Sequence, residues 1–133
     1  MSSAGLALQE AMREALVADP ALKALLGGAY VYDEVPRGAP PSYVEFTALD
    51  TRNWSTFGEK GFEHVVTVAV RCNSRSRKPA QEISAAVEAA LDGAAFPVPG
   101  HRLVNLHMVF WSVMKTGQTY GASLRFRAAT EPL

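Results

Sequence analysis

The stretch that decides the fold is residues 100–131, which read GHRLVNLHMVFWSVMKTGQTYGASLRFRAATE. Two long apolar runs flank the polar residues 115–118, and this arrangement predicts a β-hairpin. In the second run, apolar and polar residues alternate strictly, which is typical of a strand with one buried face. The predicted buried set is Tyr120, Ala122, Leu124, Phe126 and Ala128.

The first run of the hairpin carries apolar residues on both of its faces. Strict alternation places Leu103, Asn105, His107, Val109, Trp111 and Val113 on one face, and Val104, Leu106, Met108, Phe110 and Met114 on the other. Strands that are covered on both sides have this composition. The pattern therefore predicts a central or doubly covered strand.

The rest of the chain is predicted to form two groups of helices separated by three strands. An apolar stripe at helical spacing predicts a first helix over residues 6–17, and Asp19-Pro20 is a signal that starts a second, short helix. Further expected elements are strands at 29–35, 43–49 and 62–73, and a helix at 79–91. Short links between strands favour antiparallel pairing. We predict a single α+β domain over residues 1–133, with an antiparallel-rich mixed sheet of about five strands and two main helices on one face (order α-β-β-β-α-β-β).

Composition and charge restrict the classes of function. The chain has 133 residues with 13 basic and 13 acidic side chains, so its formal net charge is zero. A neutral chain argues against a protein whose main role is to grip nucleic acid through long-range attraction. The lone Cys72 cannot form an internal disulfide, and charged residues interrupt segment 6–17, which is unlike a signal peptide or a membrane span. We expect assembly in the cytoplasm and no membrane partner.

Residues with catalytic or metal-binding potential are present but lack a recognisable arrangement. The chain has no GxSxG elbow and no phosphate-binding glycine loop, and its three histidines and Cys72 lack the close spacing of a zinc site. Cys72 ends an apolar strand face, so we interpret it as a small core residue. His107 is interpreted as a hydrogen-bonded structural residue. We expect no catalytic site, no cofactor and no metal.

A basic run precedes the third expected helix. Positive charge is mildly unfavourable at a helix N-terminus, so these cations are candidates for contact with something outside the domain. A phosphate backbone and an acidic neighbouring subunit both fit, and a solvated turn is the plainer alternative. The residues are Arg71, Arg75, Arg77 and Lys78.

Segment 50–61 is polar and contains two aromatic residues. It is either a long hairpin loop or the extended ends of two strands with a tip near Gly58. An aromatic side chain in a polar loop can anchor a protein interface, or it can fold back on the sheet edge. Both interpretations remain open on the sequence. The candidate interface residues of this segment are Arg52, Trp54, Phe57, Glu59 and Lys60.

Seven segments in a fixed order carry a family resemblance. They are LALQEAMREALVADPALKALLGG, VYDEVPRGAPPSYVEF, DTRNWST, GFEHVVTVAV, AAVEAALDG, GHRLVNLHMVFWSV and YGASLRFRA. Together they resemble the tail-completion or tail-terminator proteins of long-tailed phages, and most closely the versions in phage-like gene transfer agents. The resemblance covers residues 6–131.

This resemblance implies a structural virion protein without catalytic residues. It implies a homo-oligomeric ring of six copies at the head-proximal end of the tail tube, which stops tube polymerisation and provides the head–tail joining surface. The implied partners are the tail tube protein and the neck proteins, with DNA as cargo in the lumen. The implied location is the virion tail, assembled in the host cytoplasm.

Three other functions remain open on the sequence. The first is a neck or head–tail connector component that does not cap the tube. The second is a small cytoplasmic enzyme that uses Cys72 or the histidines. The third is a nucleic-acid-binding module, which the neutral net charge disfavours.

Overall fold

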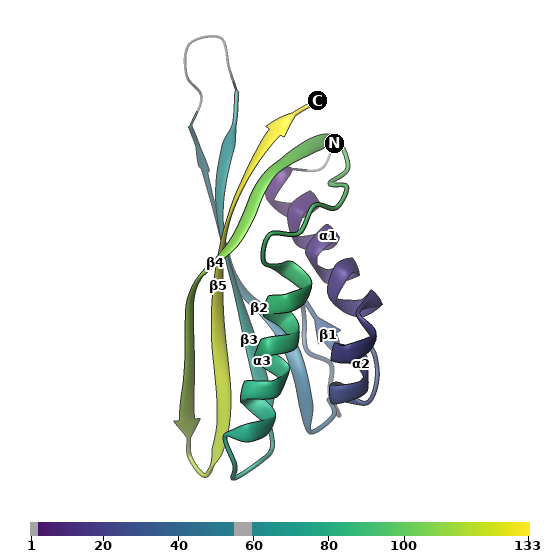
Figure 1. Cartoon of the computed structure of the whole chain (residues 1–133), viewed down its shortest axis with the longest axis vertical. Helices are drawn as coiled ribbons and strands as arrows, with labels where there is room; N and C mark the ends of the chain where they lie inside the picture. Colours follow the sequence, from purple (N-terminus) through teal and green to yellow (C-terminus); the bar gives the residue numbers. More distant parts are fainter. Residues whose placement is uncertain (1–2, 55–59) are drawn as a thin grey trace.

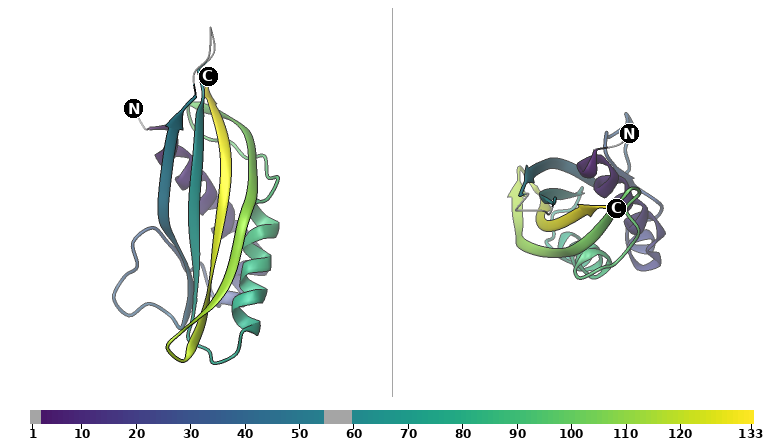
Figure 2. Two further views of the ribbon diagram at one scale, coloured as in Figure 1. Left: turned by 90° about the vertical axis from the view of Figure 1, so that its left-hand side faces the viewer. Right: turned by 90° about the horizontal axis from the view of Figure 1, so that it is seen from above.

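The computed structural model describes residues 3–54 and 60–133 as three helices packed on one face of a five-stranded mixed sheet (Figure 1). The α+β class predicted from the sequence is confirmed. The four long strands lie side by side with the helices behind them, and the end-on view shows how strongly the sheet curves (Figure 2).

The helices begin and end where side chains satisfy their terminal backbone groups. In α1 (Ala4–Ala18) the Ser3 hydroxyl accepts a hydrogen bond from the Leu6 backbone N–H at 3.1 Å. Asp19 follows α1, and its carboxylate accepts a hydrogen bond from the backbone N–H of Leu22 at 2.9 Å to open α2 (Pro20–Leu26). Gly27 closes α2 at a φ of 82°, a conformation that glycine adopts without strain. The third helix is α3 (Lys78–Leu91).

The sheet has the strand order β1-β2-β3-β5-β4. In the part of the chain that the structure describes, three strand pairs are antiparallel and one is parallel, that of the short β1 with β2. The strands are β1 (Val31–Tyr32), β2 (Ser42–Asn53), β3 (Phe62–Cys72), β4 (His101–Thr116) and β5 (Thr119–Pro132).

The core lies between the helices and one face of the sheet. Strand β5 supplies the alternating set predicted from the sequence, of which Leu124 and Phe126 are completely buried. The helices contribute an apolar stripe each, and burial of such side chains stabilises the fold by about 1.5–3 kcal/mol apiece. Completely buried helix residues include Leu8, Met12, Leu22, Val87 and Leu91.

Strand β4 differs from its prediction in two ways. It is an edge strand, not a central one, because β5 is its only strand partner among residues 3–54 and 60–133. Its faces also differ, because irregularities between Leu103 and Asn105 and between Met108 and Phe110 each add a residue and reverse the alternation. The residues opposite the buried positions of β5 are Leu103, Leu106, Met108, Trp111 and Val113.

Two other strands differ from their expected bounds. The strand expected at 29–35 shortens to Val31–Tyr32, and a turn-rich connection with Pro36, Pro40 and Pro41 follows it. The strand expected at 43–49 instead continues to Asn53, since it pairs with β3 along its whole length. The ends of both strands are therefore set by pairing with a neighbouring strand and not by local sequence signals.

Candidate functional site

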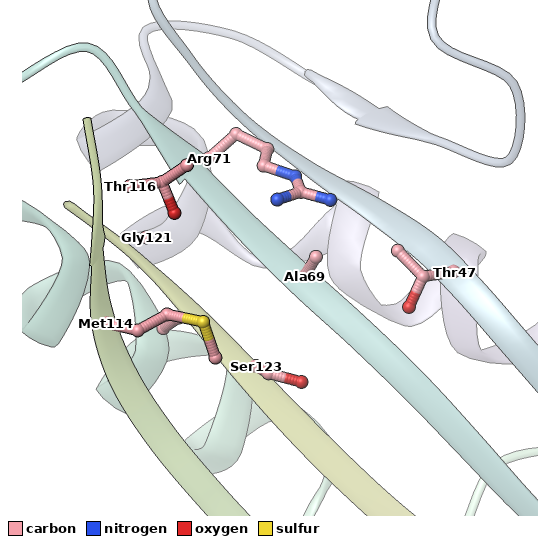
Figure 3. Close-up of a pocket in the computed structure, with 8 residues that line it drawn as sticks. Thr47, Ala69, Arg71, Met114, Thr116, Gly121 and Ser123 are labelled. Atoms are coloured by element: carbon pink, nitrogen blue, oxygen red, sulfur yellow. The ribbon is translucent and has the colours of Figure 1, made fainter. Parts of the chain in front are cut away.

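The face of the sheet that the helices leave uncovered is the first candidate surface. It holds a shallow depression of about 250 Å³ between β2 and β4 (Figure 3). Small side chains such as Ala69 and Ser123 form its floor, and Arg71 and Met114 lie on opposite sides of it. Its lining contains no cluster of acid, base and nucleophile of the kind that catalysis needs.

Ion pairs occupy much of the same face. Arg71 lies 2.8 Å from the Glu45 carboxylate, and Arg127 lies 3.3 Å from that of Glu63. Both arginine side chains are more than half exposed, so solvent screens these pairs and each contributes at most about 1 kcal/mol. The face is therefore charged but locally neutralised.

The basic turn consists of Arg71, Arg75, Arg77 and Lys78. Within the part of the chain that the structure describes, two of these four cations contact another side chain, and two do not. Arg71 on β3 pairs with Glu45 on β2, and the Arg77 guanidinium lies 5.4 Å from the centre of the Tyr120 ring. Arg75 and Lys78 are exposed, and the described residues offer neither of them an ion pair or ring contact. Of the four cations, these two are the most available to a partner.

The aromatic candidate at the β2–β3 hairpin packs against its own hairpin. The Trp54 backbone N–H donates to the Gly61 carbonyl at 3.0 Å. The indole covers Gly61 so closely that an added Cβ there would lie 2.8 Å from the ring. Arg52 and Lys60 are exposed nearby, whereas the predicted contacts Phe57 and Glu59 lie outside the described residues.

Buried His64 and Cys72 are committed to the core. His64 contacts the hydroxyls of Thr51 and Thr130 with its two ring nitrogens, at 2.9 and 2.8 Å. Burial lowers the pKa of His64 below its ordinary value of 6.5, and His101 lowers the pKa further. Burial raises the pKa of the Cys72 thiol, an effect that a hydrogen bond with Ser42 partly opposes. A thiol that resists ionisation is a poor nucleophile, and the interpretation of Cys72 as a core residue is confirmed.

His107 differs from its expected structural role. Its side chain is 61% exposed, and its Nδ1 lies 3.6 Å from the Asp92 carboxylate. Among the described residues, no group of three or more potential metal ligands comes together.

Sequence reasoning missed one surface entirely, the apolar side chains of β4. Because β4 is an edge strand, residues that were assigned to a doubly covered interior are open to solvent. The sequence signal for this surface is the presence of apolar residues on both faces of the strand. That pattern predicts burial inside the domain, whereas in the single chain the residues are exposed. The exposed residues are Val104, Val109, Phe110, Trp111 and Met114.

Comparison with known proteins defines the class. The family model described as tail completion protein gp17 matches residues 10–131. A chain in the structure titled "Virion of native gene transfer agent (GTA) particle" superposes with a TM-score of 0.90 and 30% sequence identity, over 98% of this chain and 99% of that chain. No curated protein sequence matches the chain.

The protein is therefore a structural component of a phage-type virion tail. It belongs to the tail completion protein gp17 family, and the resemblance read from the sequence is confirmed. Its location is the virion tail, where it assembles with other tail and virion proteins. Among the described residues, no helix has the length and apolar character needed to cross a bilayer.

Proposed function

We propose that six copies of the protein form a ring that caps the head-proximal end of the tail tube. The ring stops tube polymerisation and provides the surface to which neck proteins of the head attach. The observation that carries the proposal is the match to the tail completion family over residues 10–131. The near-complete overlap with a chain of a gene transfer agent virion supports it, because the whole domain has the shape of a particle component.

The basic turn is proposed to contact a neighbouring subunit or the DNA that passes through the lumen. This assignment rests on Arg75 and Lys78, whose charges are exposed, and on Arg77, which lies over Tyr120. Arg71 contributes less, since Glu45 neutralises it. A double substitution Arg75→Glu/Arg77→Glu should reduce particle assembly or infectivity while the domain stays folded.

The β2–β3 hairpin is proposed to contact the tube or the adjacent subunit. Arg52 and Lys60 present exposed cations there, and the Trp54 indole packs on Gly61. Phe57 and Glu59 belong to the same proposal on sequence grounds. If Trp54→Ala and the reversal at Arg75 and Arg77 each left assembly and infectivity intact, both placements would be wrong.

We propose a structural role without catalysis. Two of the residues that a small enzyme would use are engaged elsewhere: His64 contacts two threonines, and Cys72 is buried with its pKa raised. The variant Cys72→Ala should retain biological activity. A loss of activity in a Cys72→Ala protein of normal stability would support the enzymatic alternative.

Electron microscopy of particles from a producing strain that lacks this gene tests the proposed function. A terminator predicts overlong, headless tails beside DNA-filled heads, because nothing stops the addition of tube protein. Tails of normal length that fail to join heads would identify a neck connector instead. Restoring the gene should return both tail length and head attachment.

A further inference from the structure

Strand β4 concentrates the exposed apolar surface of the molecule. Of the eight large hydrophobic residues exposed in the described chain, five lie on this strand. Val109 and Met114 are each 51% exposed, and Phe110 and Trp111 lie between them in sequence. A cluster of this size on one edge is typical of a protein–protein contact, whereas isolated exposed apolar residues are not informative.

The exposed residues border both faces of the sheet. Trp111 pairs with buried Leu124, which places it toward the helices, whereas Phe110 pairs with Arg125 on the uncovered face. The Arg125 guanidinium lies 5.1 Å from the centre of the Phe110 ring. A partner at this edge can therefore cover apolar surface above and below the strand.

The outer backbone of β4 is covered at one place and open beyond it. The turn after α3 covers it there, because Gly93 N–H donates to the Leu106 carbonyl and Met108 N–H donates to the Asp92 carboxylate. From residue 109 to 116, no strand in the described ranges pairs with this edge. An exposed row of backbone donors and acceptors is a template for strand addition.

The opposite border of the sheet is also open over a similar length. Strand β1 pairs with β2 only at Val44 and Glu45, so residues 46–52 of β2 have no outer strand partner in the described chain (Figure 2). The N-terminus of α1 adjoins this edge, since a Cβ added at Gly5 would lie 2.9 Å from the Thr51 hydroxyl. The next residue, Leu6, is 44% exposed and adds an apolar contact beside the edge.

The two halves of the chain differ in net charge. Residues 1–61, which form α1, α2, β1 and β2, contain eight acidic and five basic side chains. Residues 62–133, which form the β3, α3, β4 and β5 side, contain five acidic and eight basic side chains. Exposed Glu10 and Asp50 lie on the first side together with exposed Arg52, and Lys115 and Arg125 lie beside β4. Two copies placed head to tail would bring opposite net charges together.

We propose that the β4 edge of one copy binds the β2 edge and the N-terminal half of α1 of the next copy. The contact is heterologous, which is the kind that closes identical subunits into a ring, and the inference rests on the ring of the proposed function. In the assembly, β4 becomes an interior strand with apolar residues on both faces. This is the environment that its sequence pattern predicts and that the single chain does not provide.

Photocrosslinking in assembled particles tests the contact. A benzophenone amino acid replaces Val109, and the same residue replaces Leu25, which is 42% exposed on α2 and lies on neither edge, as the matched control. Illumination of purified particles should give a covalent species of twice the chain mass for position 109 and not for position 25. Mass spectrometry should join position 109 to a peptide from residues 46–53 or from α1 of another copy. If position 109 does not accept the bulky residue, Met114 is the second position.

Three outcomes would overturn the proposal: a crosslink from β4 to β4 of another copy, a crosslink to a different protein, or no intermolecular product at positions 109 and 114. The result is independent of the gene-deletion test. If β4 crosslinks to the β2 edge but the deletion strain makes tails of normal length, the interface is supported and the terminator function is contradicted. Overlong tails in the deletion strain without a crosslink from β4 to the β2 edge would support the terminator function and contradict this interface.

Discussion

The Nε2 atom of His64 lies 2.8 Å from the Thr130 hydroxyl, a contact that joins β3 to β5 across 66 residues of sequence. The other ring nitrogen contacts Thr51 on β2, so one buried imidazole connects three strands of the sheet. Each threonine hydroxyl can donate or accept, and a neutral imidazole satisfies both contacts.

The position of His64 predicts that the domain loses stability in mild acid. The folded state holds His64 neutral because burial lowers its pKa below 6.5. The unfolded chain takes up a proton below its ordinary pKa of about 6.5, so the unfolded state binds more protons and gains stability as the pH falls. The free energy of unfolding should decrease below pH 6.5 by up to about 1.4 kcal/mol per pH unit from this group, until the folded His64 also protonates. Urea unfolding between pH 7.5 and pH 5 measures the slope.

The variant His64→Gln is the control for that slope. Its side chain cannot titrate and can replace only part of the threonine contacts, so it should be less stable at neutral pH by about 1–3 kcal/mol. The difference in the free energy of unfolding between wild type and variant should become smaller as the pH falls. A gap of constant size from pH 7.5 to pH 5 would show that His64 does not carry the acid sensitivity.

Gly121 is predicted to be a position that tolerates no side chain. A Cβ there would lie 2.8 Å from the carbonyl oxygen of Val70 on the paired strand, and backbone cannot move aside as a flexible side chain can. Gly121→Ala should destabilise the domain by about 1–3 kcal/mol through overpacking. Ser123→Ala, two residues along the same strand, should change the unfolding midpoint little. Equal midpoints for the two variants would contradict the close strand approach.

Two phenylalanines are predicted to separate folding from assembly. Phe126 is completely buried, so Phe126→Ala should lower the free energy of unfolding by about 3–5 kcal/mol. Phe110 is 47% exposed and should matter less for the fold, with a loss of less than about 1.5 kcal/mol for Phe110→Ala. The same Phe110→Ala variant should weaken subunit assembly by about tenfold or more. Chemical unfolding and sedimentation velocity on the same samples give both quantities, and an unchanged assembly constant for Phe110→Ala would contradict the role of β4.

A mixing experiment is predicted to reveal the polarity of the subunit contact. One variant carries Val109→Lys and Met114→Lys on β4, and the other carries Leu6→Lys and Asp50→Lys beside the β2 edge. At a concentration at which wild type assembles, each variant alone should be monomeric, because each lacks one of the two patches. Their equimolar mixture should form heterodimers and nothing larger, since one intact contact remains per pair.

The control for the mixing experiment is Leu25→Lys, which introduces the same charge on α2 and should assemble like wild type. A symmetric contact between two β4 edges gives a different result. In that case the Leu6→Lys/Asp50→Lys variant would dimerise by itself and the mixture would contain no heterodimer.

The sequence correctly predicted the elements whose buried face follows from the spacing of their own apolar residues. The strict alternation of β5 and the apolar stripes of α1 and α3 identified their buried faces, because the core covers each of them on one side only. The capping residues Asp19 and Pro20 likewise marked the start of α2.

The prediction failed where a neighbour decides the structure. Strand β4 contains bulges at two places, and no local sequence signal predicts them. The apolar residues on both of its faces indicate burial, but they do not identify the surface that covers them. The same limit applies to the sites: Arg71 appeared free in sequence and is paired with Glu45, 26 positions away. The strand at 29–35 is predicted too long, and the sequence leaves open how far the strand at 43–49 extends, because strand pairing, not composition, sets their ends.

Cryo-electron microscopy of the head–tail junction of the particle that carries this protein tests the central claim most directly. The account predicts a ring of six copies on the last turn of the tail tube, with β4 of each subunit against the β2 edge and α1 of the next. A ring at this position in which the exposed residues of β4 face solvent would contradict the interface. A protein found only on the head side of the neck, without contact to the tube, would contradict the terminator function.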